Sequence, residues 1–389
     1  MRNSLVKYLA GHEKDELALL QKLVLQQSSS FFKEGVDAVG EMITASLSDC
    51  KMQREVVVEQ ELGNHLLFRS PAYRPDQPSL LLIGHMDTVF PVDSPFNWYK
   101  EESDKVFGPG VIDMKGGLVA AIFAIKALDS CGLLEKIPLT LLCNADEEIG
   151  SPASSELICQ EAKKSTFALG FECGGLQGEV VTGRKGKAGY ILEVSGKAGH
   201  AAFAGSDKAS AILELAGKVI ALEQLNDPIK KIVVNVGLIK GGIGANTVAD
   251  FATAEIDTRY LQLEDAKSTD ERIALIASQC SVAGTHTELR RKGARLPMEQ
   301  TQRNKELFRV INKEAEKLEL PCVEELRDGV SDANTISAAA VPVVDGMGPI
   351  GDCDHSDREY MVKDSLLART TLAACTLVSG WDHFQDNVK

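Results

Sequence analysis

The chain has 389 residues, of which 44% are hydrophobic, and a formal net charge of -14 at pH 7. A chain of this length can bury a large core and has room for two domains. The acidic balance argues against nucleic-acid binding, because neutralising phosphate groups requires a basic surface. No apolar run approaches the roughly 20 residues that cross a bilayer, which excludes a membrane-spanning protein.

The N-terminal segment and the cysteines both indicate a cytoplasmic protein. Charged residues between Lys7 and Asp15 interrupt the first apolar stretch before it reaches the length of a signal core, so we expect no signal peptide. The nine cysteines are an odd number without a C-x-x-C pair, which fits neither a disulfide framework nor a zinc ribbon. We expect most of them to be buried thiols in a reducing compartment.

The first part of the chain has the pattern of an α/β domain. Apolar residues at helical spacing predict helices over 15–25 and 35–47. The segment 78–84 is short, apolar on both faces and bounded by turn residues, as is typical of a central strand in a covered sheet. A helix over 116–128 and a second apolar strand over 137–144 follow. This order implies a doubly wound, mostly parallel sheet, in which ligands bind at the carboxyl ends of the strands.

From about residue 183 the pattern changes to longer amphipathic strands. Their order with the intervening helices, β-α-β-β-α-β, is that of a ferredoxin-like layer. We expect strands over 189–195, 231–239, 248–260 and 285–292, and helices over 208–225 and 266–280.

The tail then returns to the first pattern, with a helix over 302–318, a strand over 340–344 and a helix over 364–378. We therefore predict a discontinuous α/β domain, residues 1–181 and 295–389, with an α+β domain inserted at 182–294.

The first candidate site residues stand where the central strand ends. His85 follows the strand directly, and Asp87 can reach the second nitrogen of its ring, an arrangement that fixes the tautomer of a metal-binding histidine. Taken alone, the pair H-x-D is more simply explained by a turn with a hydrogen-bonded histidine. Asp113, between glycines and a helix, could bind a metal or only cap the helix.

Three successive carboxylates, Asp146, Glu147 and Glu148, follow the next apolar strand. A solvated acidic loop is the usual explanation of such a run. Here the strand places it at the ligand-binding edge of the sheet, where unpaired carboxylates repel one another unless a cation holds them. Glu172, in GFECG, and His355, in GDCDHSDRE, extend the set to nitrogen and oxygen ligands suited to zinc, cobalt or manganese.

These motifs together resemble a known family. The segments that carry the resemblance are similar, in order and over nearly the whole chain, to motifs of the zinc aminoacylases and exopeptidases: GHMDTVFP, GPGVIDMKGG, NADEEIGS, FECGG, SGKAGHAAF and DGMGPIGDCDHSDREYM. That family includes glutamate carboxypeptidase, acetylornithine deacetylase and succinyl-diaminopimelate desuccinylase. The last motif, with residues 329–334 before it, is most similar to the glutamate carboxypeptidase branch.

The resemblance implies a site with two divalent metal ions per chain, zinc in the first place and cobalt or manganese as possible substitutes. Asp113 would bridge the two ions. His85 and Glu172 would complete one site, and Glu148 and His355 the other.

The resemblance also implies catalytic roles for residues around these ligands. Glu147 matches the general base, and Asp87 matches the carboxylate that orients the metal-binding histidine. His200, in GHAAF, matches a histidine that stabilises the tetrahedral intermediate. A cis peptide bond between Asp113 and Met114 is implied as well.

The inserted domain would bind substrate and form a homodimer, again by resemblance. Asn246 and Arg259 match residues that hold the carboxylate end of the substrate, and Gly329 would line the pocket. Asn246 could instead belong only to a turn, because Asn is a common turn former. An edge strand of the inserted sheet is available for pairing with a second subunit, and His200 would then act on the neighbouring subunit's metals.

Two other kinds of site are disfavoured. The glycines before Asn246 lack the third glycine of a dinucleotide fingerprint, and no Gly-Lys-Ser/Thr follows them. No G-x-S-x-G elbow is present. The sequence therefore predicts a metal-dependent hydrolase that cleaves an amide next to a free carboxylate, releasing a C-terminal amino acid from a small peptide. An N-acyl amino acid deacylase, or a catalytically silent protein of the same fold, stays open.

Overall fold

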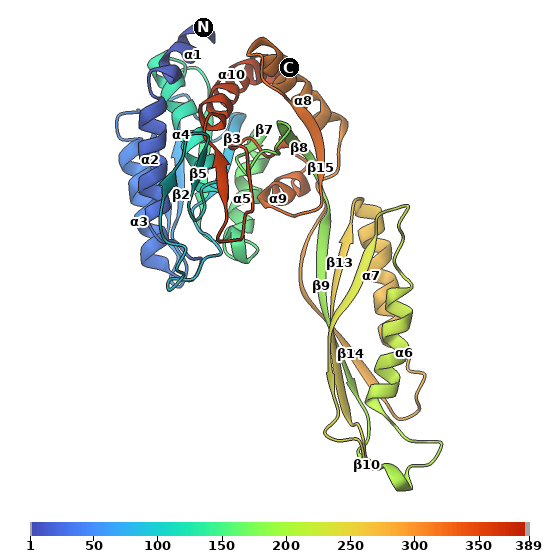
Figure 1. The fold of residues 1–389 in the computed structure, drawn as a ribbon. Coiled ribbons are helices and arrows are strands. Elements are labelled where there is room, and N and C mark those ends of the chain that lie inside the picture. Colours follow the sequence, from blue (N-terminus) through green and yellow to red (C-terminus); the bar gives the residue numbers. More distant parts are fainter. Residues whose placement is uncertain (1, 386–389) are drawn as a thin grey trace. The chain divides into compact units, whose positions relative to one another are not determined.

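The computed structural model describes residues 2–385, and the chain divides into two compact units (Figure 1). The first unit comprises Met1–Gly183, Gln300–Arg327 and Ser331–Lys389, and the second comprises Arg184–Glu299 with Asp328–Val330. The assignment of separate functions to two domains, residues 1–181 with 295–389 and residues 182–294, stays a prediction.

The first unit is built on a six-stranded sheet in the order β1-β2-β6-β3-β7-β16. β3 runs parallel to β6 and β7, and β16 runs parallel to β7, whereas β2 pairs antiparallel with both β1 and β6. The prediction of an α/β fold with a mostly parallel sheet is confirmed. The strands span Gln53–Val57 (β1), His65–Arg69 (β2), Ser79–His85 (β3), Leu139–Asn144 (β6), Ser165–Gly170 (β7) and Val343–Val344 (β16).

Helices pack on this sheet because its central strands are apolar on both faces; every residue of β3 and β6 is buried. Helix α4 (Lys115–Ser130) packs on β3. Its approach requires glycine, since a Cβ added to Gly117 would lie 1.8 Å from the carbonyl oxygen of Phe171. The other helices of this unit are α1 (Arg2–Ala10), α2 (Glu13–Leu25), α3 (Lys33–Ser46), α5 (Ser155–Lys163), α8 (Gln302–Lys317), α9 (Asp332–Ala338) and α10 (Ser365–Gln385).

None of the helices within residues 2–385 is both long enough and apolar enough to cross a membrane.

Most predicted elements of this unit are confirmed, and the differences have local causes. The strand predicted over 340–344 is limited to β16, because Ala340 has a φ of 62° and Pro342 has no N–H to donate to a neighbouring strand. Helices α1, α5 and α9 and strands β1, β2 and β7 were not individually predicted. The remaining short strands are β4 (Lys100–Glu101), β5 (Lys105–Phe107), β8 (Glu179–Arg184), β15 (Val323–Arg327), β17 (Gly351–Asp352) and β18 (Tyr360–Val362).

The second unit has the predicted β-α-β-β-α-β order. Its four-stranded antiparallel sheet, β11-β13-β9-β14, packs against α6 and α7. The core forms because alternate residues of β9 and β13 are buried, among them Tyr190, Leu192 and Ile256. The elements are β9 (Gly186–Ser195), α6 (Ala211–Glu223), β11 (Val233–Gly241), β13 (Phe251–Tyr260), α7 (Leu263–Ser278) and β14 (His286–Arg295).

The single strand predicted over 248–260 is wrong at its start, where the chain forms two strands. β12 (Thr247–Val248) pairs with β10 (Gly199–His200), and β13 begins at Phe251. The break arises because the carbonyl groups of Ala249 and Asp250 accept hydrogen bonds from Ala211 and Gly196, outside the sheet.

The expectation that most cysteines are buried is also wrong. All nine are free thiols, but only Cys50, Cys143 and Cys375 are buried. Cys280 is exposed because it follows the end of α7.

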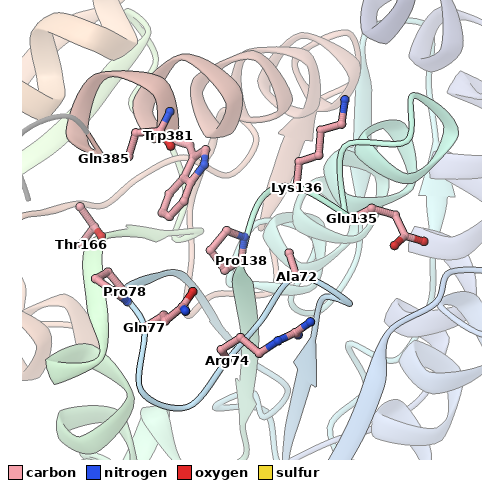
Figure 2. A pocket seen from close by; sticks show the side chains of 10 residues that line it. All are labelled: Ala72, Arg74, Gln77, Pro78, Glu135, Lys136, Pro138, Thr166, Trp381 and Gln385. Carbon is pink, nitrogen blue, oxygen red and sulfur yellow. The ribbon is translucent and has the colours of Figure 1, made fainter.

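A cavity of about 530 Å³ lies in the first unit at the amino edge of the central sheet (Figure 2). Pro78 and Pro138, which immediately precede β3 and β6, line it together with the indole of Trp381. His85, by contrast, ends β3 at the carboxyl edge. The cavity and His85 therefore lie at opposite ends of β3.

Glu16 of α2 predicts a measurable dependence of stability on pH. The side chain is fully buried, and within residues 2–385 neither carboxylate oxygen has a well-formed hydrogen bond. Burial raises its pKa to about 8, and the nearby Thr370 hydroxyl lowers it only in part. In the unfolded chain Glu16 ionises near its ordinary pKa, whereas in the folded chain it stays protonated up to about pH 8. The free energy of unfolding therefore falls as pH rises from roughly 4.5 to 8.

We expect Glu16→Gln, which cannot ionise, to gain stability relative to the wild type over that pH range, by an amount on the order of a few kcal/mol. Denaturant unfolding at pH 5, 6.5 and 8 measures the difference. A constant difference between Glu16→Gln and the wild type would contradict the assignment.

Candidate active site

The candidate site residues of the first unit meet at the carboxyl edge of its sheet. His85 is the last residue of β3, and its Nδ1 lies 2.9 Å from the carbonyl oxygen of Asp87 and 3.3 Å from Asp87 Oδ1. The Asp87 carboxylate accepts hydrogen bonds from the backbone N–H groups of Glu147 and Glu148, both at 3.2 Å, and from the Ser30 hydroxyl at 2.6 Å. Asp87 thus connects the end of β3 to the acidic segment after β6.

Asp113 lies between two histidines, with one carboxylate oxygen directed to each. Its Oδ1 is 3.1 Å from His85 Nε2, and its Oδ2 is 3.0 Å from His355 Nε2. The peptide bond between Asp113 and Met114 is cis, as the family resemblance implies.

Two glutamates extend this arrangement, one beside each histidine. Glu172, just after β7, has Oε1 3.7 Å from His85 Nε2, and Glu148 has Oε2 3.3 Å from His355 Nε2. Glu148 lies in a short 3₁₀ turn, Glu147–Ile149, that follows β6. The structure thus brings all five predicted metal ligands of the first unit together.

The donor atoms in this cluster are close enough to share metal ions. His85, Asp113 and Glu148 each offer one atom within 4.8 Å of the others, and so do His85, Glu147 and Glu172. A third such group, Asp113, Asp354 and His355, adds a residue that the sequence analysis did not single out. The buried Oε1 of Glu148 has no hydrogen-bond partner among the described residues. Nitrogen and oxygen donors in this arrangement fit a divalent ion such as zinc.

The electrostatics of the cluster also favour a cation. Burial raises the pKa of Glu148 and of Glu172, and the charge of Asp113 raises both further. Hydrogen bonds to Asp113 and Glu148 raise the pKa of His355 to about 11. Burial alone would lower the pKa of His85, but hydrogen bonds to Asp113 and Asp87 outweigh it and raise the value. Protons therefore balance the carboxylates here, and a bound divalent cation would displace them.

The other predicted site residues belong to the second unit, where they form two separate groups. His200 and Asn246 are neighbours: β10 pairs with β12, and the carbonyl of Asn246 accepts the N–H of Ala201 at 2.9 Å. Arg259 lies near the end of β13, with its Nε 2.7 Å from Asp257 Oδ1. The carbonyl of Gly329 accepts a hydrogen bond from Arg184, also at 2.9 Å.

The pair His200 and Asn246 lies at one end of the second unit's sheet, and Arg259 lies at the other. Phe251 opposes Ser195 at one end of the β13–β9 ladder, next to the segment that carries His200. Arg259 opposes Lys187 at the other end. At about 3.3 Å per residue, the intervening strand separates the two groups by roughly 25 Å.

Histidines and carboxylates that meet at the carboxyl edge of a mostly parallel α/β sheet form the kind of donor set found in metal-dependent hydrolases. The model of the family described as peptidase family M20/M25/M40 matches residues 81–379, and the chain belongs to this family. Metallopeptidases of this family bind divalent metals, generally zinc.

The comparisons with individual proteins agree over nearly the whole chain. Carboxypeptidase G2 from Pseudomonas sp. (strain RS-16) is 27% identical over 384 residues, which cover 97% of this chain and 91% of that protein. Among solved structures, a putative aminohydrolase from methicillin-resistant Staphylococcus aureus has a TM-score of 0.79 at 17% identity, covering 98% and 100% of the two chains. The M20 family metallo-carboxypeptidase Sso-CP2 from Sulfolobus solfataricus has a TM-score of 0.70 at 17% identity, covering 93% and 98%.

Proposed function

We propose that the protein is a two-metal carboxypeptidase that hydrolyses the amide bond next to the free carboxylate of a small peptide or N-acyl amino acid. The observation that carries this proposal is the Asp113 carboxylate, which directs one oxygen to His85 and the other to His355. The similarity to carboxypeptidase G2 over 97% of the chain supports the choice of a carboxypeptidase within the family.

A panel of substrates tests the proposal directly. The purified protein with Zn²⁺ would be assayed on N-acyl-glutamates, dipeptides, acetylornithine and succinyl-diaminopimelate. We expect the highest kcat/KM for substrates that release an amino acid with a free α-carboxylate. A clear preference for acetylornithine or succinyl-diaminopimelate would instead identify an N-deacylase, and no turnover of any of them would contradict the carboxypeptidase assignment.

In this proposal Asp113 would serve both ions, His85 and Glu172 would complete one site, and Glu148 and His355 would complete the other. Zn²⁺ fits this donor set, and Co²⁺ or Mn²⁺ could replace it. When bound, the ions supply Lewis-acid polarisation of the scissile carbonyl and an acidified water.

Glu147 is the proposed general base. Its backbone N–H is held by Asp87, and a side-chain oxygen lies in the same group of donor atoms as His85 and Glu172. From this place its carboxylate can take the proton of the attacking water and deliver it to the leaving nitrogen. The turn between β6 and Ile149 therefore holds a base and a metal ligand side by side.

We assign the substrate's carboxylate to Arg259, with Asn246 and Gly329 as further parts of the binding site. Arg259→Ala should lower kcat/KM for substrates with a free α-carboxylate by the equivalent of roughly 1.5 to 3 kcal/mol, the value of a hydrogen bond to a charged group. Substrates amidated at that carboxylate should be almost unaffected. Equal losses for both kinds of substrate would show that Arg259 is structural, as its ion pair with Asp257 would suggest.

We further propose a homodimer in which His200 of one subunit acts at the other subunit's metals. Arg259 and His200 lie at opposite ends of one sheet, roughly 25 Å apart, so one small substrate cannot contact both on the same unit. An edge strand suited to pairing is present: β11 ends the sheet and exposes Leu238 and Ile239. Ile220 of the adjacent helix α6 is also exposed.

Subunit mixing tests this arrangement. Inactive His200→Ala chains and inactive Glu147→Gln chains, mixed under conditions of random subunit exchange, should recover up to about a quarter of the wild-type activity. Half of the dimers are then mixed, and each mixed dimer has one intact composite site. Activity that stays at zero although subunits demonstrably exchange would mean that His200 acts within its own chain, or not at this site.

A further inference from the structure

A buried carboxylate outside the proposed ligand set binds the backbone of the loop that carries Asp113. Glu359 is fully buried. Its Oε2 accepts the N–H of Gly110 at 2.9 Å, and its Oε1 accepts the N–H groups of Ile112 at 2.9 Å and Asp113 at 3.1 Å. Three backbone donors within four residues thus share one side chain as acceptor.

The shape of the loop depends on this acceptor. Gly110 has a φ of 74°, and its carbonyl accepts the N–H of Lys115 at 2.8 Å, which turns the chain so that the three N–H groups converge. Converging backbone N–H groups form a site for an anion, and buried donors without an acceptor are costly. A carboxylate suits such a site because both of its oxygens only accept hydrogen bonds.

The same residue belongs to the segment that carries His355. Glu359 lies four residues after that histidine and immediately before β18, which pairs with β5 at the start of the Asp113 loop. His355 Nε2 and Asp113 Oδ2, the two atoms directed to the same proposed ion, are 3.0 Å apart. The carboxylate therefore connects two stretches of chain, 246 residues apart, that must meet for the ligand set to form.

We propose that Glu359 is a positioning residue that fixes Asp113 relative to His355 and so sets the affinity of the site for its metal ions. It contacts backbone N–H groups, and we assign it no contact with metal or substrate. This inference rests on the proposed function, because it assumes that Asp113 and His355 bind metal.

Glu359→Gln tests the proposal, because glutamine keeps the length of the side chain but offers one acceptor oxygen and an amide that can only donate. At least one of the three N–H groups then loses its acceptor. We expect the dissociation constants for both Zn²⁺ ions, measured in chelator-buffered solution, to rise by roughly 10- to 100-fold, as is typical when a group that orients a ligand is lost. Both should rise because both ions share Asp113.

Glu214→Gln is the matched control. Glu214 is a buried carboxylate of the second unit that also accepts backbone N–H groups, from Ser281 at 2.9 Å and Val282 at 2.7 Å. The Glu214→Gln substitution should lower the melting temperature and leave the Zn²⁺ dissociation constants unchanged. The same result for Glu359→Gln, a lower melting temperature with unchanged Zn²⁺ affinity, would overturn the proposal. A wild-type protein that binds no Zn²⁺ would instead contradict the proposed function itself.

Two further measurements cover a Glu359→Gln protein that fails to fold. Glu359→Asp keeps the charge but shortens the side chain by one methylene, so it should also weaken both Zn²⁺ sites; unchanged affinity in that variant would again overturn the proposal. In the metal-free wild type, hydrogen exchange should show protected amides at Ile112 and Asp113. Free exchange there would mean that Glu359 does not hold the loop.

Discussion

Glu147→Gln is expected to keep two metal ions per chain and to lose at least about 10²-fold in kcat, because it removes the proton acceptor without removing a ligand. Glutamine has the same length, and the backbone N–H of residue 147 still bonds to Asp87. KM should change far less than kcat, since Glu147 has no assigned role in holding the substrate. Steady-state kinetics and metal analysis by inductively coupled plasma mass spectrometry measure both quantities on one preparation.

Glu148→Gln is the natural comparison for this variant. The two residues are adjacent, and both N–H groups bond to the same carboxylate of Asp87. Only Glu148 lies 3.3 Å from His355 Nε2, however, so its loss should lower the metal content as well as the rate. Normal turnover in Glu147→Gln, or loss of metal from it, would exclude Glu147 as the base.

Some of the site residues could be placed from the sequence because they follow predicted strands of the sheet. His85 and the pair Glu147–Glu148 could be placed from the sequence, since each follows an apolar strand and parallel strands end at one edge. Glu172 follows β7, which was not predicted as a strand, so its motif alone identified it. His355 lies in a loop and has a φ of 57°. No strand pattern directly precedes it in the sequence, so its motif alone identified it.

Other parts of the site depend on contacts that no local pattern encodes. Ser30 reaches Asp87 across 57 residues, and Glu359 reaches the Asp113 loop across 246. Such pairs form only when the sheet brings distant segments together. Hydrophobic periodicity describes which face of an element is buried, and it carries no information on these polar contacts.

In the second unit, the local sequence pattern predicts the elements but not the register in which the strands pair. The order of its strands and helices follows from alternating apolar residues, which predicted β9, α6, β11, β13, α7 and β14. The pairing of Arg259 with Lys187, which places this arginine far from His200, is fixed by the ladder between β13 and β9. A shift of one residue would turn Tyr190, Ile256 and their neighbours to the other face, so the core specifies the register only after the partners are known.

The proposed role of Asp113 as a ligand shared by both ions leads to the second large expected effect. Asp113→Ala should remove both metal ions from the chain and abolish activity, because each carboxylate oxygen faces a different histidine. Alanine also removes the donor that the two proposed sites share, so neither ion keeps a complete set of donors.

His355→Ala is the comparison variant for Asp113→Ala, because it should remove a ligand of one proposed site only. His355 is assigned to one of the two proposed sites, where its Nε2 lies near Asp113 Oδ2 and Glu148 Oε2, so its loss should release one ion and leave about one per chain. Metal content after gel filtration in metal-free buffer would then fall from two in the wild type to about one in His355→Ala and to none in Asp113→Ala. Two ions retained by Asp113→Ala would show that Asp113 is not the bridge. One ion retained would mean that it serves a single site, and the assignment of Glu148 and Glu172 to separate ions would have to be revised with it.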